Sequence, residues 1–200
     1  MKLGEIKIEA LKLMFASYEV DFSETQLRNE MADDTYRDYL MNMPGAINRA
    51  FSVIENKCVL PIKSYTFDSK ELDLAKLSDF SRVYRVVFNG KGGCNVPDFL
   101  YKIENKKLLM TDELREGESY TLYYRPKLTR ITSGTDDDTE LDIPDNIAVF
   151  IPYFIKGELY REEEPGEATE AHNLFMKALD ELTPENVGHG SVTTVFGMGW

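Results

Sequence analysis

The most constraining feature of this sequence is a change of hydrophobic period, from helical to alternating and back to helical. Residues 143–182 carry apolar side chains at helical spacing in two stretches, with an acidic turn at 162–166 between them. The stretches hold Ile147, Phe150, Ile151, Phe154, Ile155 and Leu159, and then Ala171, Leu174, Phe175, Ala178, Leu179 and Leu182. We expect a helical hairpin here that completes a core begun elsewhere in the chain.

Two prolines shape the first half of this hairpin. Pro144 suits a first helical turn, where the missing N–H does no harm. Pro152 lies inside the apolar pattern and removes one backbone donor. We therefore expect Pro152 to bend the helix or to separate its first turns.

The first 61 residues also indicate helices. Apolar spacing predicts an amphipathic helix over about residues 4–16. Ser23 and Gln26 match a capping box, and Phe22 and Leu27 match a hydrophobic staple, so a second helix should start at Ser23.

A third helix should begin at Pro44, after a short connection, and end before Pro61. Its apolar stripe is Ile47, Ala50, Phe51, Ile54 and Cys58.

Between residues 62 and 132 the pattern is typical of strands. Residues 82–88 and 119–126 are rich in β-branched and aromatic side chains, and Asn105 to Lys107 offer a hairpin turn. The glycine-rich segment 89–95 fits a hairpin loop, because no helix start follows it as a phosphate loop would need. We expect four to six short strands, followed by a mobile acidic connection.

The predicted fold class is therefore α+β. Segments 1–61 and 142–182 form a helical bundle, 62–132 an antiparallel β-rich insertion, 133–141 an acidic linker and 183–200 an extended C-terminal arm.

Charge and cysteine content exclude several classes of function. The 200-residue chain has 35 Asp and Glu against 23 Lys and Arg, a net charge of −12, which argues against a protein that grips phosphates. Cys58 and Cys94 have no metal-ligand spacing, and we expect both thiols to be free. The charged N-terminus does not resemble a signal peptide, and no run reaches membrane-spanning length.

Few residues could carry chemistry. The chain has two histidines, of which His172 should lie on the polar side of the last helix and His189 in the tail. Residues 136–138 are three aspartates, but their spacing does not match a calcium loop. We expect no catalytic residue, no cofactor and no metal ion.

Two aromatic or apolar segments leave alternatives open. The tyrosines of strand 119–126 could form a stacking platform, although alternating aromatics more often face a core. The tail is either disordered or docks in a partner's groove. Its apolar residues are Val192, Val195, Phe196, Met198 and Trp200.

Three segments carry a resemblance to a known family: LGEIKIEALKLMF at the start, MPGAINRAFSVIENKCVLP before the strands, and the hairpin 143–179. They resemble the head-to-tail adaptor (connector) proteins of tailed bacteriophages, including the group called tail tubular protein A. The resemblance covers residues 3–61 and 142–182.

The resemblance implies a structural virion protein of the phage neck, assembled in the host cytoplasm. The helical bundle would form a ring, commonly of twelve subunits, between the portal protein and a downstream tail or nozzle protein. Residues 183–200 would be a portal-docking arm, and Leu174, Phe175, Ala178 and Leu179 would form a subunit-packing helix. An acidic channel would let DNA pass without specific binding.

Two other functions are weighed against this one. The β insertion could be a ligand or carbohydrate receptor carried on a helical stalk, which an exposed aromatic cluster on a sheet would favour. A small enzyme could use carboxylates such as Asp136 and Glu140, but no acid–base pair can be placed on rigid elements.

Overall fold

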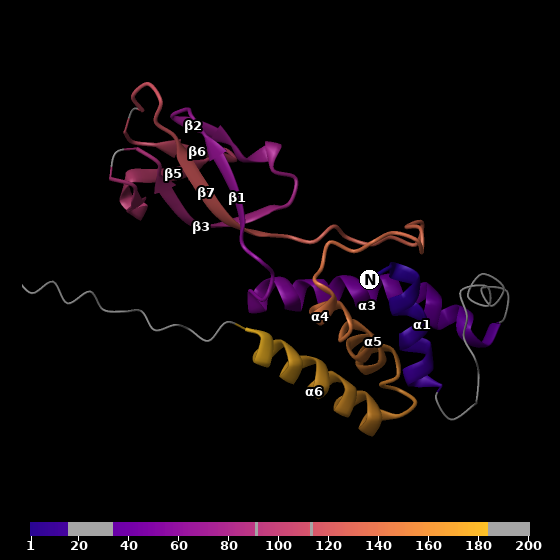
Figure 1. Ribbon diagram of the computed structural model, residues 1–200. Helices are drawn as coiled ribbons and strands as arrows, with labels where there is room; N and C mark the ends of the chain where they lie inside the picture. Colours follow the sequence, from indigo (N-terminus) through magenta and orange to yellow (C-terminus); the bar gives the residue numbers. More distant parts are fainter. Residues whose placement is uncertain (16–33, 91, 113, 184–200) are drawn as a thin grey trace, which may run out of the picture.

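The computed structural model describes residues 1–15, 34–90, 92–112 and 114–183. In these residues the protein is α+β, as predicted, with helices at both ends of the chain and antiparallel strands between them. Figure 1 shows the strands standing apart from the helices as a separate lobe. The predicted helix start at Ser23 lies outside the described residues.

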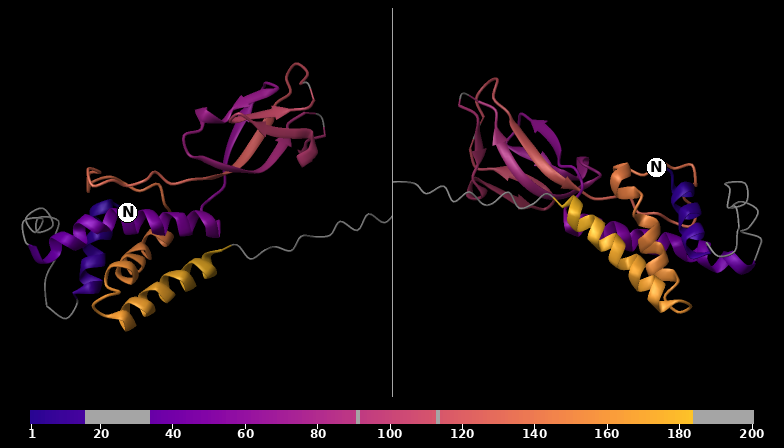
Figure 2. Two further views of the ribbon diagram at one scale, coloured as in Figure 1. Left: turned by 180° about the vertical axis from the view of Figure 1, so that it is seen from behind. Right: turned by 60° about the horizontal axis from the view of Figure 1, so that its bottom comes forward.

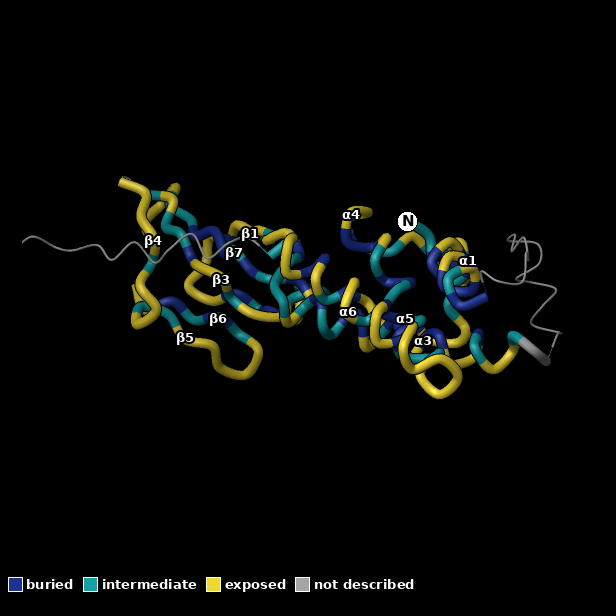
Figure 3. The backbone as a smooth tube through the Cα atoms, turned by 90° about the horizontal axis from the view of Figure 1, so that it is seen from below, coloured by how far each residue is buried: buried dark blue, intermediate teal, exposed yellow. Residues whose placement is uncertain are grey.

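The helices gather around one apolar core, which we call the helical unit. It contains α1 (Leu3–Met14), α3 (Asp34–Lys57), α4 (Asp145–Ala148), α5 (Ile151–Leu159) and α6 (Pro165–Leu182). Helix α5 lies in the middle and packs against α1, α3 and α6. Its core cluster shares no residue with the core cluster of the strands, and Figure 3 shows buried residues, in dark blue, in both parts of the chain.

Pro152 divides the first half of the C-terminal hairpin, as predicted. The short helix α4 ends at Ala148, and α5 begins at Ile151 with Pro152 in its first turn. The missing proline N–H therefore falls where no intrahelical partner is needed. Both helices bury apolar side chains in the core of the helical unit.

Pro44 does not start a helix, and this prediction was wrong. Helix α3 runs continuously from Asp34 to Lys57 with Pro44 in its interior. An internal proline costs a helix about 3 kcal/mol, but its neighbours Met43, Ala46 and Ile47 are fully buried here. Packing of this face offsets the lost hydrogen bond. The helix ends where Cys58 adopts a left-handed conformation with φ of 60°.

The strands form two sheets around a second apolar cluster, which together we call the β unit. The four-stranded sheet has the order β1-β7-β3-β4 and the three-stranded sheet β2-β6-β5, with every pairing antiparallel. The strands are β1 (Lys63–Phe67), β2 (Glu71–Asp73), β3 (Phe80–Phe88), β4 (Cys94–Val96), β5 (Tyr101–Glu104), β6 (Lys107–Met110) and β7 (Tyr120–Pro126). The described residues thus hold seven strands, not four to six.

Two predicted hairpins of the β unit are confirmed. Asn105 and Lys106 connect β5 to β6 with positive φ angles of 50° and 61°, which suit a two-residue turn. The glycine-rich segment after Phe88 connects β3 to β4, which pair antiparallel. The tyrosines of β7 divide between the faces: Tyr120 and Tyr124 are buried in the core, whereas Tyr123 is only half-buried.

Helix α6 lies close to α5 because the facing residues are small. A Cβ atom on Gly157 would lie 3.0 Å from the His172 Cβ and 3.1 Å from the Ala168 carbonyl oxygen. Phe175 fills the adjoining space and meets Phe154 edge-on at 4.9 Å between ring centroids.

Replacing Phe175, whose side chain is 0% exposed, by alanine should lower the free energy of unfolding by about 3–5 kcal/mol. The physical cause is a cavity between α5 and α6. The neighbouring variant Leu174→Ala, at a residue 45% exposed, should change stability by no more than about 0.5 kcal/mol. Urea unfolding followed by circular dichroism measures both, and equal losses would contradict this account of α6.

Candidate functional site

The connection from β7 back to the helices is fixed to α3 along its length. We call residues 127–143 the strap; its apolar residues Leu128, Ile131 and Ile143 are buried in the core of the helical unit. The prediction assigned the first two to the β insertion, but they pack against helices. Figure 1 shows the strap running along α3 toward α1 and returning to α4.

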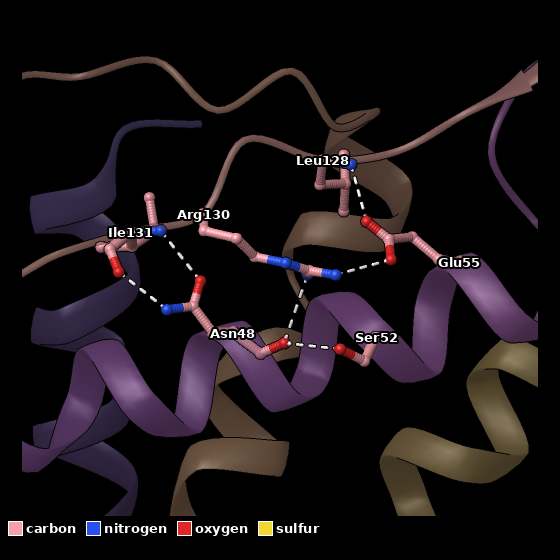
Figure 4. A network of polar contacts seen from close by, with 6 residues as sticks. All are labelled: Asn48, Ser52, Glu55, Leu128, Arg130 and Ile131. Carbon is pink, nitrogen blue, oxygen red and sulfur yellow. Dashed lines mark hydrogen bonds and ion pairs between the residues drawn. The ribbon is translucent and has the colours of Figure 1, made fainter. Parts of the chain in front are cut away.

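Asn48 of α3 holds the strap by two hydrogen bonds, shown in Figure 4. Its Nδ2 donates to the Ile131 carbonyl oxygen at 2.7 Å, and its Oδ1 accepts from the Ile131 N–H at 2.8 Å. The side-chain amide therefore satisfies both backbone groups of one strap residue, as a neighbouring strand would.

Glu55, two turns further along α3, holds the beginning of the strap. One carboxylate oxygen accepts the Leu128 N–H at 2.7 Å, and the other lies 2.7 Å from Arg130 Nη2. Both oxygens of a half-buried carboxylate are thus engaged, and hydrogen bonds to a charged group are among the stronger ones.

The acidic part of the strap is docked on α1, so the expectation of a mobile connection was wrong. The N–H groups of Leu3 and Gly4, at the start of α1, donate to the carbonyl oxygens of Thr139 and Asp137 at 3.0 and 2.8 Å. Lys7 pairs with the Asp137 carboxylate at 2.6 Å. The free N–H groups of a helix start need such acceptors, which explains why this polar run is ordered.

A charged cluster joins the two units where the chain enters β1. Lys63 lies 2.8 Å from Asp79 and 2.9 Å from Asp142, and the Tyr124 hydroxyl donates to Asp79 at 3.0 Å. The hydrogen bonds to Asp142 and Asp79 raise the pKa of the Lys63 ammonium. Burial acts to raise the pKa of Asp79, but the hydrogen bonds from Lys63 and Tyr124 outweigh it and hold this pKa below its usual value.

The outer face of the four-stranded sheet carries a cluster of two tyrosines and two arginines, which we call the Arg–Tyr face. The Arg85 guanidinium lies over the Tyr123 ring at 4.5 Å, and the Arg125 guanidinium lies over the Tyr84 ring at 5.4 Å. Tyr84 is 50% exposed. This arrangement is a cation–π ladder open to solvent.

Strand irregularity builds this face. The pairing of β3 with β7 shifts register between Phe80 and Arg82 and again between Val83 and Arg85. The second shift leaves Tyr84 without a paired residue on β7, and such a bulge lets Tyr84 and its neighbour Arg85 share one face of the sheet. Arg125 is anchored by the Cys58 carbonyl oxygen at 2.8 Å, at the carbonyl end of α3.

Three arginines of the four-stranded sheet have no acidic partner among the described residues. No carboxylate in the described part of the chain lies within ion-pair distance of Arg82, Arg85 or Arg125. Many cations elsewhere are paired, including Lys7, Lys63 and Lys156. The face is therefore a local positive patch on an acidic protein.

The predicted site residues are distributed differently. Phe175, Ala178 and Leu179 of the expected subunit-packing helix are buried within the chain, which leaves them no free surface for a neighbour; Leu174 is exposed. The apolar face of α6 packs against α5, and these three side chains are therefore buried within one subunit. The predicted arm residues Val192, Val195, Phe196, Met198 and Trp200 lie outside the described residues, as does His189.

Other candidates for chemistry lie apart from one another. His172 faces α5, with its ring 5.4 Å from that of Phe154. Cys58 and Cys94 are free thiols, as predicted. Within the described ranges, no group of three His, Cys, Asp or Glu side chains could hold a metal ion. In the same residues, no helix combines the length and apolar character that a bilayer crossing requires.

Sequence reasoning missed the Arg–Tyr face and the strap contacts. The alternation of Tyr123 and Arg125 with buried residues was a signal that these side chains share the outer face of β7. The register shifts in β3 and the partners of Asn48 had no such signal, because both depend on which segments meet in space.

The sequence matches no protein-family model and no curated protein.

Asn48→Asp should release the strap from α3, because an aspartate cannot donate to the Ile131 carbonyl oxygen and its negative charge is hard to place there. We expect a loss of about 1–3 kcal/mol in unfolding free energy and faster amide exchange at Ile131. Hydrogen exchange measured by mass spectrometry checks this. Ser52→Ala is the control, since Ser52 bonds only within α3 among the contacts in Figure 4.

Lys63→Met should destabilise the protein near neutral pH, and its effect should shrink in acid. The pKa of Asp79 is lower in the folded protein than in the unfolded chain, where it is about 4, so its carboxylate stabilises the fold above that pH. This stabilisation is lost as the pH falls through the pKa of the folded state. The pKa of Lys63 is raised in the folded protein, so the stabilisation by its ammonium group is present at lower pH. That stabilisation is lost only above about pH 10. Urea midpoints between acid and neutral pH test this, with Lys76→Met as an exposed control; a difference independent of pH would contradict it.

Proposed function

We propose that this protein is a structural adaptor of a phage neck, in which copies of the chain assemble as a ring between the portal and the tail. In this proposal the helical unit forms the body of the ring and the C-terminal arm contacts the portal. The resemblance of residues 3–61 and 142–182 to head-to-tail adaptors is its starting point.

The observation that carries the proposal is apolar surface exposed on the helical unit, among the residues that the structure describes. Met41 of α3 is 61% exposed, and Leu174 of α6 and Val149 after α4 are each 45% exposed. Single exposed apolar residues are ordinary, but these three all lie on the helical unit and outside its buried core cluster. A neighbouring subunit would cover them.

The strap supports the same proposal, because an adaptor must hold its partner-binding parts in a fixed arrangement. Asn48 and Glu55 attach the strap to α3, and Lys63 ties β1 to Asp142 at its other end. The β unit is therefore held to the helices at both of its chain connections. The charge of −12 is compatible with a channel whose carboxylates repel passing DNA phosphates.

The alternative, a ligand or carbohydrate receptor in the β unit, gains one observation. A pocket of about 430 Å³ lies between the two sheets, lined by apolar residues such as Phe88, Met110 and Tyr120. The charged residues Asp112, Arg115 and Glu118 also line it. The Arg–Tyr face suits a sugar less well, because each tyrosine ring already has a guanidinium group over it. Glycan-array binding by the full chain would favour this alternative.

Mixing the full chain with the portal protein of the same phage should give a stable ring complex, which size-exclusion chromatography and electron microscopy detect. Leu174→Asp should weaken ring formation by roughly tenfold or more, since it places a charge at a desolvated contact, and should leave the unfolding midpoint unchanged. Asn173→Asp adds the same charge at the adjacent exposed residue and should preserve the ring.

Deleting residues 191–200 from the full chain should weaken portal binding while ring formation by the helical unit persists. Unchanged portal binding would contradict the docking role of the arm. If the wild-type chain forms no ring, alone or with the portal, the proposed function itself is wrong.

A further inference from the structure

We propose that the Arg–Tyr face binds the acidic turn between α5 and α6 of a second copy of this chain, so that copies contact head to tail. This inference rests on the proposed ring and assigns one of its interfaces. Three features favour the acidic turn as the occupant of the Arg–Tyr face: the charge of the two surfaces, their exposure, and their placement at opposite ends of the molecule.

The Arg–Tyr face has the chemistry to receive carboxylates. The Arg85 guanidinium lies over the Tyr123 ring and the Arg125 guanidinium over the Tyr84 ring, which restrains both side chains; Arg85 is exposed and Arg125 half-buried. Arg125 is further fixed by the Cys58 carbonyl oxygen. Preorganised guanidinium groups bind carboxylates through paired hydrogen bonds, and less rotamer freedom is lost on binding.

The turn between α5 and α6 presents the complementary charge. Glu162, Glu163 and Glu164 are consecutive and exposed. Glu163 accepts a hydrogen bond from the Tyr39 hydroxyl of α3, which ties the turn to the helical unit. In the described part of the chain, no cation lies within ion-pair distance of Glu162 or Glu164.

The two surfaces cannot meet within one chain. The β unit and the α5–α6 turn lie at opposite ends of the molecule in Figure 1 and in both views of Figure 2. A contact between different surfaces of identical copies repeats from copy to copy and closes into a ring when the rotation permits. Two different surfaces that cannot meet within one copy are free to form such a heterologous contact between copies.

The same observations disfavour nucleic acid as the occupant. The patch is small, and the chain around it carries 35 acidic side chains against 23 basic ones. A long polyanion would meet that acidic surface beyond the patch, whereas a short turn of three glutamates would cover the arginines alone.

Charge reversal in the full chain tests the contact. Arg85→Glu and the double variant Glu162→Lys/Glu164→Lys should each weaken self-association by roughly tenfold or more at low salt, because each places like charges together. Mixing the two variants should restore association, since every alternating contact then pairs opposite charges. Sedimentation velocity and native mass spectrometry measure these states, and Lys76→Glu is the matched control on the β unit, expected to associate like the wild type.

The outcomes separate this inference from the proposed function. A wild-type ring that both reversals leave intact overturns the contact while the adaptor function stands. Reversals that weaken the ring without rescue on mixing also overturn the pairing. Binding of heparin or DNA that is lost in Arg85→Glu, with self-association unchanged, would assign the face to a polyanion instead. A wild-type chain that never assembles, with or without the portal, removes the proposed function and this interface together.

Discussion

The helical unit depends on the burial of α5. This helix has nine residues, too few to be stable alone, yet α1, α3 and α6 all pack against it. Pro152 allows α5 to begin at a new angle after α4, and Gly157 allows α6 to approach closely. Since the N-terminal helices contribute the other walls of this core, the chain must return after the strands before the unit is complete.

The strap converts this core into a support for the β unit. An extended connection of 17 residues would ordinarily leave its backbone groups to water, but here side chains of α3 and the start of α1 receive them. Three apolar strap residues are buried in the same core. The orientation of the β unit is therefore set by specific hydrogen bonds and packing at the helices, and a change at the strap would be transmitted to it.

Particular elements show how far sequence reasoning reached. The helix broken at Pro152, the hairpin turn at Asn105 and Lys106, and the free thiols followed from local chemistry and were found. The prediction of a helix start at Pro44 was wrong, because the free energy gained by burying the face of α3 around Pro44 exceeds the preference of proline for a first helical turn. Residues 133–141 misled for a related reason: a polar, acidic composition is typical of loops, but the N–H groups of α1 gave it partners.

The sequence by itself determined the α+β class, the order of helices and strands, and most of the residues that face a core, because these depend on periodicity and on local backbone preference. Tertiary structure alone decided that the chain's own core, and not a neighbouring copy, covers Phe175 and Leu179, that Asn48 holds Ile131, and that Arg85 and Arg125 gather over two tyrosines. The physical reason is that these contacts join segments far apart in the chain. The side chains that remain free for a partner are known only once the contacts within the folded chain are known.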